Sequence, residues 1–391
     1  MKYFLIAGEA SGDIHAAQLI KELKQQDKDA SFGFLGGDLM EQAAGCKPII
    51  HYKDMAYMGF IEVIKHLQEI LGFMRTAENH ISGERPDAVI LIDYPSFNLK
   101  VAKYAFEAGV PVFYFISPKV WAWKEYRVND IKRYVKEVYS ILPFETKFYA
   151  THNYRVEYVG NPTVKEISDA QRNFMGELNF RNKYNLDPGM PIIAVVPGSR
   201  RKEIVNNLPE MLLAARTFAD HQTVIAAAPN IDPSLYEGII NSIATGDQPP
   251  VIHNDTFQLI HSARAALVTS GTASLETAVL GTPQVVCYRL NGSRILRAIY
   301  PIAIHTKYIS LPNLINDAPV VDELILDQSN WKNIAVHLRP LLKDSPQRSA
   351  MLKGYAEMMR RLGTTDCAAL AASRLISRIN HDAKFKNFPQ Q

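Results

Sequence analysis

The stretch YFLIAGEASGDIHAAQLIKELKQ, residues 3–25, decides the expected fold of this chain. Residues 3–7 form a continuous apolar run, which predicts a strand buried on both faces. Residues 14–25 repeat apolar side chains at helical spacing, and the turn before them carries Gly8 and Gly12. A strand, a glycine turn and a helix in this order begin a parallel strand–helix–strand unit.

The same succession recurs along the chain. In the first half it predicts strands at 88–92 and 112–116, with a helix at 99–108 between them. In the second half it predicts strands at 192–196, 223–227, 265–269 and 284–287, with helices at 208–218 and 273–280. The strand at 284–287 is expected to be the last, and the chain beyond it to be helical to about Asn380. We therefore predict an α/β protein of two doubly wound, Rossmann-like domains facing across a cleft, with a helical C-terminus.

The length of 391 residues favours two domains over one, because single hydrophobic cores stop growing below this size. A Gly-Asn-Pro turn at 160–162 precedes a polar segment with few large apolar residues. We predict a first domain over 1–165, a linker over 166–190, a second domain over 191–363, and a C-terminal helix and tail over 364–391.

The composition is that of an ordinary soluble protein, with 47% hydrophobic and 21% charged residues. A net charge of +3 argues against a nucleic-acid binder. Cys46, Cys287 and Cys367 lie far apart and suit buried free thiols better than disulfides or a zinc site. The N-terminal apolar run is shorter than a signal peptide or a membrane span, so a cytoplasmic location is expected.

The loop at 8–13 follows the first predicted strand and opens the first predicted helix. Ligands of open α/β sheets bind beyond the carboxyl ends of the strands, which makes Glu9, Ser11, Gly12 and Asp13 candidates for substrate contact. The sequence is neither GxGxxG nor a Walker A motif. A tight turn capped by Ser11 or Asp13 explains the glycines equally well.

Asp93 ends another buried strand in the run IDYPSFN, residues 92–98. Partial burial raises the pKa of a carboxyl group, which suits a general base. Glu9, expected at the same edge of the sheet, is the second candidate. The alternative is that Asp93 only caps the turn that Pro95 sets.

Two loops of the second half, at 197–200 and 270–274, join a strand to a helix and are rich in Gly, Ser and Thr. Such loops offer backbone amides to a diphosphate, and a guanidinium adds further donors. Glu276, one turn later, is expected to accept ribose hydroxyls, although a solvated first-turn glutamate is the simpler explanation. The nucleotide- and phosphate-binding candidates in these loops are Ser199, Arg200, Ser270, Gly271 and Thr272.

Apolar residues recur at helical spacing over 55–77 with basic residues between them. A stripe of this kind usually packs in a core, but an apolar face rimmed by bases also suits an anionic membrane. The membrane-contact candidates are Phe60, Ile64, Leu67, Leu71 and Met74. The only DxD sequence, at 27–29, suits a surface loop, so no metal and no cofactor are expected.

Several runs together resemble one family, the lipid-A-disaccharide synthases, which are inverting glycosyltransferases. The matching runs are GEASGD (8–13), AYMGFIEVI (56–64), LIDYPSFN (91–98), SPKVWAWK (117–124), LPFE (142–145), VVPGSRRKEI (195–204), TSGTASLETAVLGTPQVVCYR (269–289) and YISLPNLI (308–315). The resemblance implies transfer of 2,3-diacylglucosamine from UDP to the 6-hydroxyl of 2,3-diacylglucosamine 1-phosphate. It also implies a peripheral enzyme at the cytoplasmic face of the inner membrane and a possible homodimer. By motif match, Asp93 takes the role of base, Arg200 a UDP-phosphate role and Asn313 a nucleotide-side role.

Two other classes remain open at this point. A UDP-N-acetylhexosamine 2-epimerase would share the fold and the UDP loops but needs no acceptor, and the apolar stripe speaks against it. A non-enzymatic binder of nucleotide sugars or lipids would need neither Asp93 nor Arg200.

Overall fold

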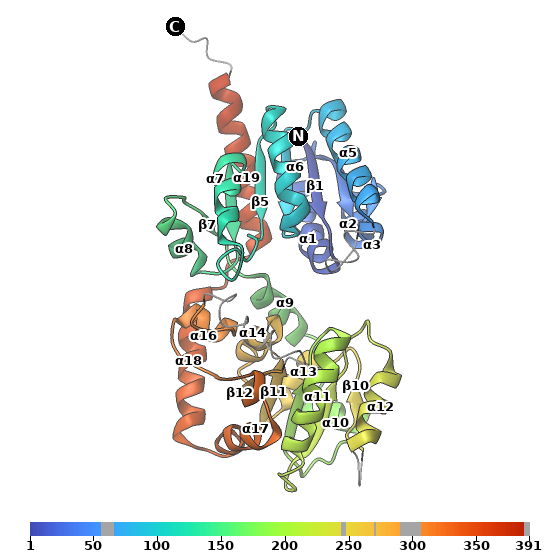
Figure 1. The fold of residues 1–391 in the computed structure, drawn as a ribbon, viewed down its shortest axis with the longest axis vertical. Coiled ribbons are helices and arrows are strands. Elements are labelled where there is room, and N and C mark those ends of the chain that lie inside the picture. Colours follow the sequence, from blue (N-terminus) through green and yellow to red (C-terminus); the bar gives the residue numbers. More distant parts are fainter. Residues whose placement is uncertain (56–65, 244–247, 270, 290–305, 387–391) are drawn as a thin grey trace. The chain divides into compact units, whose positions relative to one another are not determined.

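A computed structural model describes the chain except residues 56–65, 244–247, 270, 290–305 and 387–391. The chain divides into two compact units. The first unit is Met1–Pro162 together with Thr364–Gln391, and the second is Thr163–Gly363. Each unit is built on one parallel sheet (Figure 1).

The sheet of the first unit has seven strands in the order β3-β2-β1-β4-β5-β6-β7, all parallel. The strand order reverses between β1 and β4, which is the topological switch point of this sheet. The strands are β1 (Lys2–Ala7), β2 (Ser31–Gly36), β3 (Ile50–His51), β4 (Ala88–Ile92), β5 (Val112–Phe115), β6 (Glu137–Ser140) and β7 (Glu157–Tyr158).

The sheet of the second unit has six strands in the order β10-β9-β8-β11-β12-β13, again all parallel. Its switch point lies between β8 and β11. The strands are β8 (Ile192–Val196), β9 (Gln222–Ala226), β10 (Val251–Ile252), β11 (Ala265–Thr269), β12 (Gln284–Tyr288) and β13 (Asp322–Ile325).

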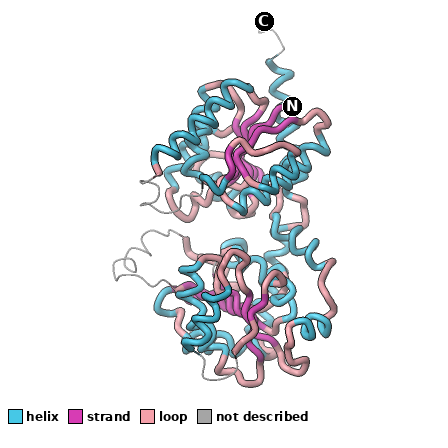
Figure 2. Tube along the Cα trace, turned by 90° about the vertical axis from the view of Figure 1, so that its right-hand side faces the viewer, coloured by secondary structure: helices cyan, strands magenta, loops and turns pink. Residues whose placement is uncertain are grey.

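Helices cover both faces of each sheet, so that the strands lie inside a layer of helices (Figure 2). In the first unit these are α1 (Ala10–Gln26), α2 (Asp38–Ala44), α3 (Tyr52–Met55), α5 (Leu67–Glu84), α6 (Pro95–Glu107), α7 (Val128–Tyr134), α8 (Glu145–Thr151) and α19 (Cys367–Lys386). In the second they are α9 (Pro162–Gln171), which starts at the boundary, α10 (Glu177–Lys183), α11 (Arg201–Ala215), α12 (Pro233–Ile243), α13 (Thr256–Ser262), α14 (Thr272–Val279), α16 (Leu311–Asn316), α17 (Trp331–Leu338) and α18 (Pro346–Leu362).

The apolar strands form these sheets because both of their faces are covered. Along β1, Phe4 and Ile6 enter one buried cluster, whereas Tyr3 and Leu5 enter the cluster on the opposite face of the sheet. Each fully buried side chain of this size contributes about 1.5–3 kcal/mol to folding. The central strands are therefore almost entirely apolar, as predicted, and the predicted α/β fold with its helical C-terminus is confirmed.

The range 166–190, predicted to be a linker, differs from that prediction. It holds most of α9 and all of α10, and Ile167, Phe180 and Leu186 are buried in the core of the second unit. Three apolar side chains suffice to fix this polar segment because each fills a pocket against the sheet.

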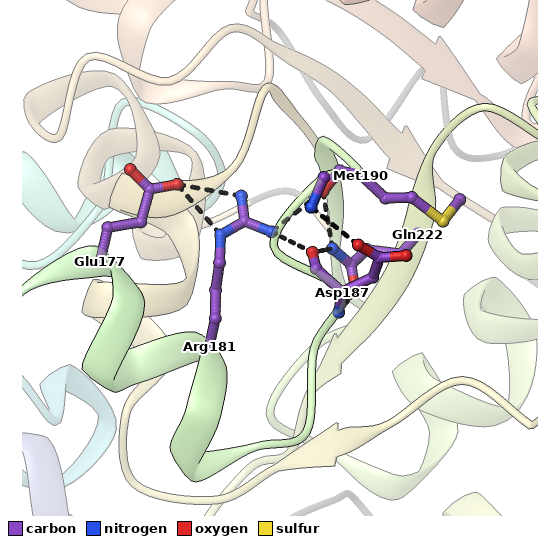
Figure 3. Close-up of polar contacts among 6 residues, drawn as sticks. Glu177, Arg181, Asp187, Met190 and Gln222 are labelled. Carbon is purple, nitrogen blue, oxygen red and sulfur yellow. Dashed lines mark hydrogen bonds and ion pairs between the residues drawn. The ribbon is translucent and has the colours of Figure 1, made fainter.

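Arg181 holds the segment between α10 and β8 in place through hydrogen bonds to its backbone carbonyls, as Figure 3 shows. Its guanidinium donates to Glu177 Oε1 at 3.0 and 3.1 Å, and to the carbonyls of Asp187 and Met190 at 2.7 and 3.0 Å. Gln222, the first residue of β9, donates to the same two carbonyls at 2.7 and 2.6 Å. This network lies at the amino ends of β8 and β9 and leaves their carboxyl ends to the candidate site.

Three other predicted boundaries were wrong. The strand at 284–287 is not the last, because β13 follows it. The sequence of β13, DELI, carries two acidic residues, which a strand at the edge of a sheet tolerates. Helix α11 starts at Arg201 rather than 208 and continues through Pro209. The C-terminal helix α19, predicted to be separate, packs against α1 in the first unit.

Candidate active site

The loops predicted to carry chemistry follow the strands on either side of the two switch points. Ala7 of β1 pairs with Ile92 of β4, so Gly8 and Asp93 leave the sheet side by side. Val196 of β8 pairs with Val268 of β11, so the loops that begin at Pro197 and after Thr269 do the same in the second unit. These are the positions at which doubly wound sheets bind ligands.

Asp93 and Tyr94 both adopt left-handed backbone conformations, with φ of 42° and 46°. Such values are strained for residues other than glycine, and the surroundings hold them. The buried amide of Asn98 donates to the carbonyl of Asp93 at 2.8 Å, and the hydroxyl of Tyr114 donates to the same oxygen. Both of these bonds engage the backbone carbonyl of Asp93 and not its carboxyl group.

The carboxyl group of Asp93 is largely buried. This burial raises its pKa above the usual range, while the charge of Lys119 and the backbone amide of Tyr94 oppose the shift. A carboxylate with a raised pKa is a stronger base. The environment therefore suits the predicted role of proton acceptor.

Glu9 lies next to this site. A Cβ atom on Gly8 would overlap the ring of Tyr94, so the glycine lets that ring cover the loop. Burial raises the pKa of the Tyr94 hydroxyl, and the charge of Glu9 raises it further. Glu9 thus stands within electrostatic reach of the residue that follows Asp93, and Ser11 in the first turn of α1 is exposed.

Asp13 is occupied by the fold rather than by a substrate. Its side chain is 3% exposed, and it accepts hydrogen bonds from the amides of Gly37 (2.8 Å), Leu39 (3.1 Å) and Met40 (3.1 Å). These amides open α2, so Asp13 caps that helix from a distant part of the sequence. Gly12 is buried against Ala7 and Ile92. Both residues thus have structural roles, although Asp13 caps α2 and not the 8–13 turn that it was expected to cap.

Ser199 and Arg200 precede α11. Glu203, in the first turn of this helix, accepts hydrogen bonds from their backbone amides. Glu203 Oε2 accepts from the amides of Ser199 at 3.1 Å and Arg200 at 3.3 Å. The Arg200 side chain is 68% exposed and donates to Glu203 Oε1 at 3.3 Å. An incoming phosphate would meet an accessible guanidinium but would compete with a carboxylate for these two amides. The glutamate three residues after Arg200 is the sequence signal for this cap.

The other loop opens α14. Ser270 lies outside the described residues; Gly271 has a φ of 129°, and Thr272 is exposed. Among the described residues, the buried hydroxyl of Thr269, the last residue of β11, has no hydrogen-bond partner. An orphaned donor beside a helix N-terminus fits a ligand oxygen.

Glu276 is partly buried rather than exposed. Burial raises its pKa to about 7, and the charge of Glu166 adds to the shift. The simple explanation of a solvated first-turn glutamate therefore does not fit this residue.

Asn313 is fully engaged within the second unit. Its amide nitrogen donates to the carbonyl of Val321 and to Glu323 Oε1, each at 2.9 Å. Its oxygen accepts from the amides of Val320 at 2.7 Å and Val321 at 2.8 Å. With a 1% exposed side chain, Asn313 ties α16 to β13, and this differs from the expected nucleotide contact.

The apolar stripe divides between core and surface. Phe60 and Ile64 lie outside the described residues, and Leu67 begins α5. Met74 is 9% exposed and belongs to the core of the first unit, which fits core packing and not the membrane contact for which it was a candidate. Leu71 is 42% exposed.

Sequence reasoning did not single out Glu145, which is buried behind the loop that follows β5. Its Oε1 accepts from the indole nitrogen of Trp121 at 2.9 Å, and its Oε2 accepts from the hydroxyl of Ser140. The runs SPKVWAWK and LPFE contain Trp121 and Glu145, but nothing in them indicates that the two meet.

Among the described residues, no three His, Cys, Asp or Glu side chains gather in a way that could hold a metal ion. No described helix is both long enough and apolar enough to cross a membrane. Cys287 and Cys367 are buried as predicted, whereas Cys46 is exposed.

Comparison with solved structures shows the fold. The UDP-GlcNAc 2-epimerase of Neisseria meningitidis bound to UDP-GlcNAc superposes with a TM-score of 0.63 at 13% identity, over 98% of this chain and 100% of that one. The calicheamicin glycosyltransferase superposes with a TM-score of 0.59 at 17% identity, over 97% of this chain and 98% of that one. At these identities the likeness extends to the glycosyltransferase-B type of fold alone.

Sequence relatives are more specific. The lipid-A-disaccharide synthase of Acidobacterium capsulatum is 36% identical over 97% of this chain and 95% of its own length. That of Koribacter versatilis is 34% identical over 96% of this chain and 98% of its own length. The family model described as lipid-A-disaccharide synthetase matches residues 3–374. The chain belongs to the lipid-A-disaccharide synthase family.

Proposed function

We propose that the chain joins UDP-2,3-diacylglucosamine to 2,3-diacylglucosamine 1-phosphate, giving a β-1,6-linked disaccharide 1-phosphate and UDP. The family membership supports the hexosyl transfer. The observation that carries the mechanism is the Asp93 carboxyl group, held at the switch point of the first sheet with a raised pKa. The epimerases share only the fold at 13% identity, so their isomerisation is not favoured.

In this mechanism Asp93 accepts the proton of the acceptor's 6-hydroxyl group. The hydroxyl oxygen attacks the anomeric carbon from the face opposite the diphosphate, and the bond from that carbon to the diphosphate breaks. Attack from the opposite face inverts the configuration, which gives the β linkage. Glu9 is the second candidate for the base.

The second unit is proposed to bind UDP. Arg200 donates to the diphosphate as negative charge develops on it, and Thr272 with Gly271 offers the N-terminus of α14. Ser199 and Ser270 lie in the same two loops, and Glu276 accepts the ribose hydroxyls. The accessible guanidinium of Arg200 and the orphaned hydroxyl of Thr269 support this assignment.

The protein is proposed to act as a peripheral enzyme at the cytoplasmic face of the inner membrane. Both substrates carry acyl chains, which reside in a lipid surface. The exposed side chain of Leu71, next to exposed Arg75 on the following turn of α5, supports contact with an anionic membrane.

The test is Asp93→Asn, which keeps the shape of the side chain but cannot accept a proton. We expect the single-turnover rate of disaccharide formation to fall by roughly 10²–10⁴. UDP affinity, measured by calorimetry, should be unchanged because the nucleotide is assigned to the other unit. A rate close to that of the wild type would move the base to Glu9, since Asp13 is committed to α2.

A further inference from the structure

Glu145 is a buried acid that the proposed reaction does not use. It begins α8, is 1% exposed, and lies behind the 117–124 segment, which follows β5. The bonds from Trp121 and Ser140 occupy one carboxyl oxygen each. Keeping an acid away from water is costly, so its environment is specialised.

The 117–124 segment is fixed to α8 and its surroundings by more than this carboxyl group. The indole of Trp121 packs edge-on against the ring of Phe144, with 4.9 Å between the ring centres. The hydroxyl of Ser117 lies 2.6 Å from that of Tyr149. Ile116 enters the segment with a φ of 65°, a strained value for a β-branched residue. The contacts with α8 hold the chain in this unfavourable path.

Of the two lysines in the segment, Lys119 and Lys124, Lys119 is the more exposed. It is exposed, and its charge acts on two carboxyl groups, those of Glu145 and Asp93. At Asp93 burial raises the pKa and Lys119 opposes the rise. The charge of Lys119 thus lowers the pKa of both the buried acid, Glu145, and the proposed base, Asp93.

We propose that Glu145 is a positioning residue of the reaction, which fixes the 117–124 segment so that Lys119 acts on the Asp93 carboxylate. The proposal rests on the proposed function, because it assigns Asp93 the role of base. Glu145 does not touch the substrate; it acts through Trp121 and Lys119.

The ionisation of Glu145 gives this role a pH dependence. Burial raises its pKa to about 7, against the hydrogen bonds from Ser140 and Trp121 and the charge of Lys119. The charge of Glu145 also acts on the hydroxyl of Tyr149, whose pKa is itself raised by burial. Above pH 7 the carboxylate attracts Lys119, and below it the neutral acid does not.

The first experiment compares the wild type with Glu145→Gln, which keeps the shape and removes the charge. At about pH 8 we expect kcat to fall roughly tenfold to hundredfold, since small displacements of catalytic groups cost this much. Near pH 6 the two proteins should converge, because the wild-type acid is then protonated. Glu125→Gln, an exposed change that follows the segment and pairs with His152, is the matched control and should have no effect.

The second experiment removes the other partner with Lys119→Met, a surface change that leaves the core intact. It should move the acid limb of the kcat/KM profile to higher pH, because Asp93 loses a charge that favours its ionised form. The double variant with Glu145→Gln should be no slower than the slower single variant, which is the mark of residues acting through each other.

A Glu145→Gln defect of equal size at both pH values, or additive effects in the double variant, would overturn the proposal. So would an unchanged acid limb in Lys119→Met. Each of these outcomes requires an active wild type. An inactive wild type would instead refute the proposed function, and a fully active Asp93→Asn variant would move the base to Glu9.

Discussion

The carboxyl group of Glu276 lies largely buried on α14, where burial and the charge of Glu166 raise its pKa to about 7. Its pKa in an unfolded chain is near 4.5, so the folded protein binds the proton more tightly. The stability that this group contributes is full below pH 4.5 and is lost as the pH rises to 7. The loss amounts to roughly 3 kcal/mol.

Glu276→Gln should therefore raise the free energy of unfolding at about pH 8 and leave it unchanged near pH 4. The same variant should bind UDP more weakly at pH 8, because an amide is a poorer acceptor for two ribose hydroxyls than a carboxylate. Urea unfolding and calorimetry measure the two effects. Glu237→Gln, an exposed change on α12, is the control. Unchanged UDP affinity would remove Glu276 from the binding site.

Single residues also show how far the sequence alone can reach. It placed Asp93 and the glycine loops correctly at the ends of strands, because apolar runs mark the strands and the ends follow. It could not assign Asp13 or Asn313, because the amides that each one binds come from segments far away or from the next loop. The sequence records a polar side chain but not the donors that reach it.

Among the helices, α2 depends on Asp13, whose carboxyl group caps its N-terminus. Asp13→Ala should lower the free energy of unfolding by about 1–3 kcal/mol, because three backbone amides lose their acceptor. Asp38→Ala removes an exposed acid from the first turn of the same helix and should have a smaller effect. Full stability combined with lost activity would return Asp13 to the list of substrate contacts.

Helix α5 offers a second test, because its apolar stripe serves two purposes. Leu71→Glu should fold normally and bind less to anionic vesicles, since an exposed apolar residue becomes acidic. Met74→Glu should lose roughly 4 kcal/mol or more of stability, since a charge enters the core. Vesicle flotation and thermal unfolding separate the two variants. Undiminished vesicle binding by Leu71→Glu would argue against this face as the membrane contact.

The elements missed by sequence reasoning share a cause. Strands β3, β7 and β10 are two residues long, and β13 is acidic, so none of them shows an apolar run. Strands β2 and β6, which lie next to the edges of the first sheet, were also missed, because small or polar residues interrupt their apolar side chains. The helices of the 166–190 range are short and polar, and their few buried side chains become visible only against the sheet. Apolar periodicity finds the centre of a doubly wound sheet and misses its edges.

At the scale of the whole molecule, the second unit is inserted into the first. The chain leaves the first unit at Pro162 and returns at Thr364, where α19 buries Ala371 and Leu375 against residues of α1 such as Leu19. The range 1–165, predicted to be the N-terminal domain, thus lacks α19, which packs in the same unit.

A chain that ends at Gly363 should therefore damage the first unit and spare the second. Loss of α19 uncovers the apolar cluster that contains Leu19, Ile20 and Phe113, and we expect that chain to aggregate. Residues 163–363 expressed alone should fold and bind UDP. Circular dichroism and calorimetry on both fragments provide the measurement. A soluble 1–363 chain with full stability would show that α19 is dispensable.

The return of α19 also sets an order in time during synthesis on the ribosome. The strands of the first unit emerge before those of the second, yet α19, which helps to cover one face of their sheet, is translated after the whole second unit. The second unit can thus finish folding while the first still exposes apolar surface, although N-terminal domains usually fold first. The half of the enzyme begun earliest is completed only after the other half has been made, so its nascent form exposes the kind of apolar surface that chaperones bind.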